Sequence, residues 1–264
     1  MGTQLSQVRQ PAILPPRVVI HGGGGAGKTT FGASAPSAIL MPLEEGEGIL
    51  NVQALPKPGC YVDVMNALGE LQVEEHPYKT LVLDTIDHLE PLIWQAVCDT
   101  DSKKNHIEDF GYGKGYTKAD PFWIGFFQAL DGLRRKGMTI LALCHNEGKI
   151  IDDPTAGSYN KWTPKLHKRA NALLYEWADV VGFLEVERMV QRGDGDSDKK
   201  ARSTSTGQRM LYLEDLGGFV AKNRYDLPTR LSIPKEDSYQ TLRAEIIKSI
   251  TNAKQARESA GKAA

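Results

Sequence analysis

The sequence predicts an α/β fold, in which helices cover both faces of a mainly parallel, twisted sheet. Short runs rich in Val, Ile and Leu alternate along the chain with segments of helical periodicity, an order typical of parallel sheets. A glycine-rich loop at residues 22–27 separates the first apolar run from the first predicted helix, as in strand–loop–helix units that bind phosphate. The 264 residues are 41% hydrophobic and 25% charged, which suits a globular protein.

Strands and helices are expected to alternate in chain order. The strands, each a short apolar run, are expected at residues 17–21, 37–43, 80–84, 138–145, 180–187 and 210–214. The helices are expected at residues 28–34, 61–74, 87–99, 119–135, 165–177 and 238–255. Polar segments at 101–118, 146–164 and 191–208 are expected to be long loops, and the last has the composition of a disordered segment.

A single core domain is expected at residues 17–232, between a flexible lead-in at 1–16 and a C-terminal helix and tail at 233–264. No apolar stretch reaches the roughly 18 residues that span a membrane, and no secretory signal is evident. Cys60, Cys98 and Cys144 are too scattered for a disulfide framework, so we expect a cytoplasmic protein. The formal net charge of −1 restricts any nucleic-acid site to a local patch.

The segment at residues 21–30 fits the P-loop pattern G-x-x-x-x-G-K-[ST]. Glycines let such a loop wrap around phosphate oxygens with its N–H groups pointing inward. The segment also fits G-x-G-x-x-G, but a dinucleotide site does not need the Lys-Thr pair, and a glycine-rich surface turn is the other alternative. We therefore expect ATP as cofactor, bound by Gly22, Gly23, Gly24, Gly25, Ala26, Gly27, Lys28, Thr29 and Thr30.

Two side chains are expected to hold Mg²⁺ beside the phosphates. The Thr29 hydroxyl is a hard oxygen ligand, and Asp84 ends an apolar run that a parallel sheet would bring next to the P-loop. Lys28 is expected to reach the β- and γ-phosphates. Asp87 is expected to cap the helix that follows.

ATP hydrolysis also needs a group that orients water. The apolar run at residues 38–43 ends in Glu44 and Glu45, and we expect Glu44 to be the catalytic group, with Glu45 or a solvated acidic turn as alternatives. A further apolar run ends in His145 and Asn146. His145 is expected to contact the γ-phosphate, unless the pair only caps the strand.

At these motifs the chain resembles the RecA-type ATPase core, and more closely a phage family of stand-alone RecA-core ATPases that promote single-strand annealing. The P-loop and the strand that ends at Asp84 are common to most P-loop ATPases, and the glutamate after the second strand is more particular to RecA-like proteins. The resemblance spans about residues 17–232 and rests on residues 22–30, 43–46, 81–84, 110–116, the strand that ends at His145, 162–167, 176–181 and 221–224.

The resemblance implies a RecA-like P-loop fold, a catalytic glutamate at Glu44 and two mobile DNA-binding loops at about 101–118 and 146–164. By analogy with RecA-like assemblies, Lys222 and Arg224 are candidates for cations that complete the phosphate site of a neighbouring subunit. A solvated basic turn or a DNA contact is the alternative for these two residues.

The residues themselves give an independent, weaker argument for DNA. Aromatic rings can stack on bases while lysines pair with phosphates, and the segment 110–118 interleaves both kinds of side chain. The alternative is a loop that packs on the domain or covers the nucleotide. The predicted DNA-binding residues are Phe110, Tyr112, Lys114, Tyr116, Lys118, Lys161 and Lys165.

With the resemblance, these observations predict a Mg²⁺-dependent, DNA-stimulated ATPase that binds single-stranded DNA and promotes strand annealing as an oligomer. The resemblance implies a role in phage recombination in the bacterial host cytoplasm. The protein's expected partners are single-stranded DNA, further copies of itself in a ring or filament, and a single-strand-binding protein, with no membrane. A RecA-like hexameric helicase is the first alternative and a small-molecule P-loop kinase the second. The kinase is disfavoured because Arg134 and Arg135 lie at a helix end rather than in a lid.

Overall fold

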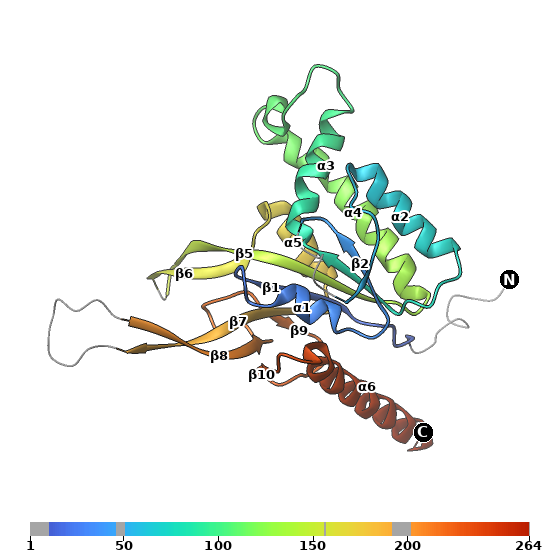
Figure 1. Cartoon of the computed structure of the whole chain (residues 1–264), viewed down its shortest axis with the longest axis vertical. Coiled ribbons are helices and arrows are strands. Elements are labelled where there is room, and N and C mark those ends of the chain that lie inside the picture. The colour runs from blue at the N-terminus through green and yellow to red at the C-terminus, as the bar shows by residue number, and fades with distance from the viewer. Residues whose placement is uncertain (1–10, 46–50, 156, 192–201, 264) are drawn as a thin grey trace, which may run out of the picture.

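Figure 1 shows the computed structural model, which describes residues 11–45, 51–155, 157–191 and 202–263. The strands are β1 (Arg17–Gly22), β2 (Ala38–Pro42), β3 (Gln53–Ala54), β4 (Thr80–Asp84), β5 (Thr139–Asp153), β6 (Gly157–Pro164), β7 (Val180–Gln191), β8 (Arg202–Tyr212), β9 (Lys222–Asn223) and β10 (Arg230–Ile233). The helices are α1 (Lys28–Ala33), α2 (Tyr61–Val73), α3 (Leu89–Cys98), α4 (Lys114–Arg135), α5 (Lys168–Trp177) and α6 (Ser238–Ala263), with short 3₁₀ helices η3 (Ile86–His88) and η4 (Ile107–Phe110).

The strands form one sheet in the order β10-β8-β7-β1-β5-β4-β2-β3, while β6 pairs with β5 and β9 with β7. From β7 to β3 along this order the neighbouring strands run parallel, and β8, β9 and β10 pair antiparallel. The α/β prediction with a mainly parallel sheet is confirmed. Because parallel strands end at one edge, the segments after β1, β2 and β4 come together there, beside His145 in the middle of β5.

Apolar side chains on the two faces of the sheet belong to two separate clusters. On β4, Leu81 and Leu83 pack with α2 to α5, whereas Val82 packs with α1 and α6. Figure 1 shows the same layers, with α2, α3 and α4 on one side of the sheet and α6 on the other. Both faces of the central strands are therefore buried, which holds the strand ends in a fixed register.

Two of the expected loops contain regular structure, so the expectation is wrong for 146–164 and wrong in part for 101–118, where residues 101–106 and 111–113 are turns and bends. Within 101–118, η4 and the first turn of α4 are formed; α4 begins at Lys114 rather than at 119, after left-handed glycines at Gly111 and Gly113. The segment 146–164 is a hairpin, in which β5 continues to Asp153 and β6 returns antiparallel to it. In the third segment, residues 202–208 belong to β8, and residues 192–201 lie outside the described residues.

Helix α6 is docked on the domain through its first turns. Tyr239, Leu242 and Ile246 are buried beside Phe31 of α1, and the Tyr239 backbone N–H donates to Ser34 Oγ at 2.9 Å. The helix therefore covers the face of the sheet that carries α1. Within the described residues, no helix is long and apolar enough to cross a membrane.

Candidate functional site

The glycine-rich loop follows β1 directly and leads into α1. Gly22, the last residue of β1, is in register with His145 on β5, and Gly27 adopts a left-handed conformation before α1 begins at Lys28. The Lys28 ammonium donates to the carbonyls of Gly22 at 3.0 Å and Gly23 at 3.1 Å. Burial lowers the pKa of Lys28. The strand, loop and helix therefore follow the predicted order, with the lysine folded over its own loop.

Asp84 ends β4 beside this loop, where its carboxylate is nearly enclosed. Burial raises the pKa of Asp84, and a hydrogen bond with the Thr29 side chain opposes that shift. The other carboxylate oxygen, Oδ1, is buried without a hydrogen-bond partner in the described structure. A buried carboxylate beside a hydroxyl, with a free oxygen, fits the hard-oxygen ligands that Mg²⁺ prefers.

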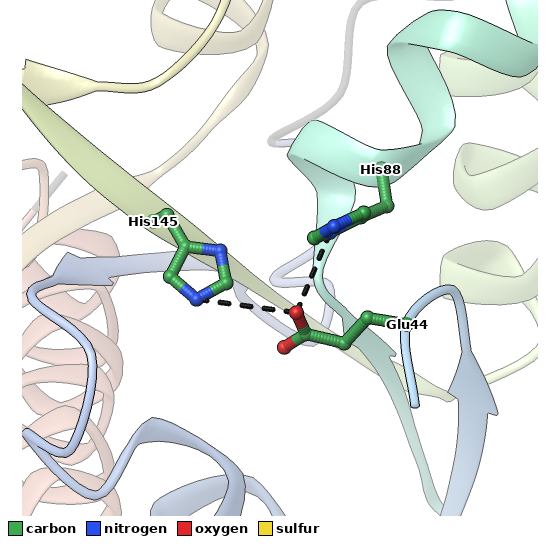
Figure 2. A group of neighbouring side chains, drawn as sticks. All are labelled: Glu44, His88 and His145. Atoms are coloured by element: carbon green, nitrogen blue, oxygen red, sulfur yellow. Dashed lines mark ion pairs between the residues drawn. The ribbon is translucent and has the colours of Figure 1, made fainter. Parts of the chain in front are cut away.

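Glu44 follows β2 and points toward two histidines, as Figure 2 shows. Its Oε2 lies 3.5 Å from Nδ1 of His88 and 4.0 Å from Nε2 of His145. Glu45 instead is exposed and pairs with Lys57 at 2.7 Å, and Gly46 lies outside the described residues. Of the two glutamates, Glu44 is the one that the fold brings to the edge with His145.

The ligand atoms of Glu44, His88 and His145 lie within 4.8 Å of one another. One carboxylate oxygen and two imidazole nitrogens at this separation could hold a transition-metal ion after small side-chain movements. The same groups lie where Lys28 and Asp84 meet the strand ends, since Glu44 contributes to the electrostatic environment of both.

Asp87 holds His145 rather than capping a helix, so the capping expectation is wrong. Its carboxylate accepts the His145 backbone N–H at 2.9 Å and the ring Nδ1–H at 3.0 Å. Burial opposes ionisation of Asp87, but the hydrogen bonds from His145 outweigh it and lower the pKa to about 2. The residue that begins the turn, Thr85, makes a hydrogen bond with His88 instead, at 2.9 Å.

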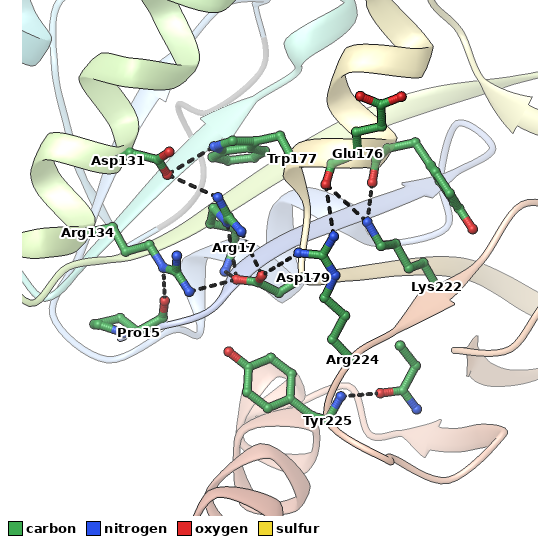
Figure 3. Close-up of polar contacts among 12 residues, drawn as sticks. Pro15, Arg17, Asp131, Arg134, Glu176, Trp177, Asp179, Lys222, Arg224 and Tyr225 are labelled. Carbon is green, nitrogen blue, oxygen red and sulfur yellow. Dashed lines mark hydrogen bonds and ion pairs between the residues drawn. The ribbon is translucent and has the colours of Figure 1, made fainter. Parts of the chain in front are cut away.

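Lys222 and Arg224 lie at the opposite edge of the sheet from the P-loop. Strand β9 pairs Lys222 with Val181, near the start of β7. Lys222 donates to the backbone carbonyls of Tyr175 and Glu176, and Arg224 pairs with Asp179 at 3.3 Å. Figure 3 shows Asp179 surrounded by guanidinium groups; those groups belong to Arg17, Arg134 and Arg224. Within one chain, neither cation reaches the phosphate loop.

The aromatic residues of the first expected DNA loop differ in exposure. Tyr116 stacks on His167 with a centroid separation of 4.1 Å and meets Trp94 edge-on. Phe110 packs against the core between the ammonium groups of Lys104 and Lys118. Tyr112 is fully exposed, at 102%. The contacts of Phe110 and Tyr116 favour a segment that packs on the domain, which was the alternative to stacking on DNA bases.

The basic residues of the second expected loop lie on and below the hairpin. Lys161 pairs with Asp215 at 2.7 Å, whereas Lys165 is exposed and its backbone N–H donates to the His145 carbonyl at 2.8 Å. A cavity of about 630 Å³ opens beside His88, with Lys149, Lys165 and Lys168 in its wall. Lys165 thus directly adjoins the strand end that carries His145. Lys114, the first residue of α4, is exposed.

Arg209 is a residue near the P-loop that the sequence did not indicate. It lies on β8, one residue before the apolar run expected at 210–214, and its guanidinium packs against Gly27. No motif marks it, because its strand is brought to the P-loop only through β7 and β1.

Comparison with known families adds one finding. A family model described as an AAA domain matches residues 14–225, which include every candidate residue of the phosphate site. No curated protein matches the sequence.

Proposed function

The chain belongs to the AAA domain family of P-loop ATPases, and on that premise we propose that it is a Mg²⁺-dependent ATPase that anneals complementary DNA strands in phage recombination. The observation that carries the ATPase part is the convergence of Lys28, Asp84, Glu44 and His145 at one edge of the sheet. These residues come from separate segments and meet only through the parallel register.

Each of these side chains has a chemical role in the proposal. Lys28 neutralises phosphate charge, while Thr29 and Asp84 hold Mg²⁺, which supplies charge stabilisation at the phosphates when bound. Glu44 orients and deprotonates the attacking water. His145 donates Nδ1–H to Asp87, and as an imidazolium it has a second donor, Nε2–H, for a γ-phosphate oxygen.

The DNA part of the proposal is supported by the position of the cavity beside His88, whose wall holds three lysines and three carboxylates, with Lys149 paired to Glu147. Lys165 in this wall is bonded through its backbone to His145, so a strand bound at Lys165 and Lys168 would lie next to the residue proposed to contact the γ-phosphate. We further propose a homo-oligomer, a ring or a filament, that acts on single strands with a single-strand-binding protein in the host cytoplasm. In such an assembly Lys222 and Arg224 face the nucleotide of the next subunit.

The test is the ATPase rate without DNA, with single-stranded DNA and with duplex DNA, together with oligomer size and annealing of complementary strands. We expect the largest rate with single strands, and annealing that requires Lys28. Equal rates in all three conditions would count against the DNA role. Strand separation on forked DNA without annealing would favour a hexameric motor instead.

A further inference from the structure

The guanidinium of Arg209 occupies the space that a side chain at position 27 would fill. A Cβ atom built on Gly27 would lie 2.5 Å from Cζ of Arg209, 2.8 Å from Nη2 and 2.9 Å from Nε, closer than packed atoms approach. Glycine at position 27 therefore serves two purposes: its positive φ of 92° forms the turn before Lys28, and its missing side chain admits Arg209.

Arg209 reaches the loop from a strand two positions away in the sheet. Leu211 on β8 and Leu213, directly after it, pack in the same apolar cluster as α1. Arg209 shares the face of Leu211 because side chains alternate along a strand. The backbone of Arg209 is held on both sides, opposite Val186 of β7 and Ile233 of β10. Its approach to Gly27 is thus fixed by the sheet.

The guanidinium of Arg209 has no anionic partner among the residues that the structure describes. Its Nη1 atom is buried without a hydrogen-bond partner, and among the described residues no carboxylate forms an ion pair with Arg209. A second cation, Lys28, is buried, follows Gly27 directly and donates its hydrogen bonds to backbone carbonyls of its loop. The carboxylates of Asp84, Glu44 and Asp87 offset part of its charge. Arg209 is half-buried, and a cation whose donor atom is buried without a partner is costly, so its position beside Lys28 favours an anion as the missing component.

We propose that Arg209 binds a phosphate group of the nucleotide held by the P-loop of its own chain. The proposal rests on the proposed ATPase function. It differs from the role of Lys222 and Arg224, which lie at the opposite edge and can act only on a neighbouring subunit. A guanidinium donates up to five N–H groups in a fixed fork, so it fixes the orientation of a phosphate as well as its charge.

The test is equilibrium binding of fluorescent ATP and of inorganic triphosphate to the wild-type chain and to Arg209→Gln, Arg209→Lys and Arg230→Ala. Arg209→Gln should weaken both ligands about 10-fold or more, since one charge-assisted contact is lost. Arg209→Lys should retain part of the affinity, and Arg230→Ala, at an exposed position on β10, should match the wild type. The nucleotide-free melting temperature should not fall in Arg209→Gln, because an unpaired cation is removed.

Two results would overturn the inference: unchanged binding of inorganic triphosphate by folded Arg209→Gln, or a marked loss of its nucleotide-free stability, which would indicate a structural role. Lys28→Ala is the reference. If Lys28→Ala abolishes binding and Arg209→Gln does not, only the Arg209 proposal fails. If neither variant changes binding, the proposed nucleotide site itself fails.

Discussion

The carboxylate of Asp87 holds both the backbone N–H and the ring of His145, at 2.9 Å and 3.0 Å. This pair lies in the middle of β5, where the strand leaves the core and enters the hairpin. Asp87 thereby joins the turn after β4 to His145, the residue expected to contact the γ-phosphate. Ionisation of the Asp87 carboxyl is therefore expected to affect both folding stability and ATPase activity.

Asp87 should make folding stability depend on acid pH. Its pKa is lowered from 3.8 to about 2 in the folded chain, so its contribution is present above pH 3.8 and is lost as the pH falls through about 2. Asp87→Asn should reduce the free energy of unfolding at pH 7 by roughly 2 kcal/mol. Chemical denaturation at pH 7 and pH 3 measures it, with the exposed Asp99→Asn as control. An identical loss in both variants would show that the His145 bonds contribute nothing.

Lys28→Ala should abolish ATP turnover, because Lys28 is the lysine of the phosphate loop. Asp84→Asn should weaken Mg²⁺-dependent binding and hydrolysis by removing the charge from a buried carboxylate beside Thr29. Phosphate release and a Mg²⁺ titration measure both effects. A normal rate of ATP hydrolysis in Lys28→Ala would contradict the proposal that this loop is the ATPase site.

Glu44→Gln should preserve ATP affinity while hydrolysis falls by roughly 10²-fold or more, since general-base catalysis is lost. Glu45→Gln is the matched control, because Glu45 is exposed and paired with Lys57. Single-turnover kinetics and nucleotide binding separate the two effects. The opposite pattern would move the catalytic role to Glu45.

Mixing two inactive variants should test action across a subunit interface. Arg224→Ala and Lys28→Ala, each inactive alone, should regain partial ATPase activity together, because some interfaces pair an intact P-loop with an intact Arg224. Arg209→Gln mixed with Lys28→Ala should show no more activity than Arg209→Gln contributes alone, since both residues serve the same chain's site. Failure of the first mixture, despite co-assembly shown by size, would exclude the role in trans.

Tyr112→Ala should weaken single-stranded DNA binding by ~1–3 kcal/mol with little change in salt dependence, because a stacking ring is lost and no phosphate contact. Lys114→Ala should lower the salt slope by about one unit. Tyr116→Ala is the contrasting variant: its ring is stacked on His167, so its loss should reduce stability more than DNA affinity. Fluorescence anisotropy at several salt concentrations separates these outcomes. Unchanged affinity in Tyr112→Ala would leave this segment with a packing role.

The central sheet could be predicted from the sequence because the apolar runs that indicate its strands are also the segments buried by tertiary packing. The apolar run before Gly22 and the one ending at Asp84 are strands in the structure with nearly the predicted bounds. The hairpin was missed because β5 passes from a buried to an exposed environment after Cys144, so its second half has no apolar pattern. The start of α4 was missed because glycines at 113 and 115 suggest a loop, although Gly115 packs tightly against the Ile107 backbone.

The sequence predicted candidate site residues where a motif spans adjacent residues or where a polar side chain marks the end of an apolar strand. Asp84 ends β4 and Glu44 follows β2, so both could be found by the second rule. Arg209 could not, since only the strand order brings β8 to the P-loop. The role of Asp87 was likewise hidden, because its partner lies 58 residues away in the chain.

Strand β5 is continuous from the buried core through His145 to the tip of the hairpin at Asp153. The stretch from His145 to that tip is about 27 Å long at roughly 3.3 Å per residue. Because no break separates the two ends of this stretch, a tilt of about 5° at His145 would displace the hairpin tip by roughly 2 Å.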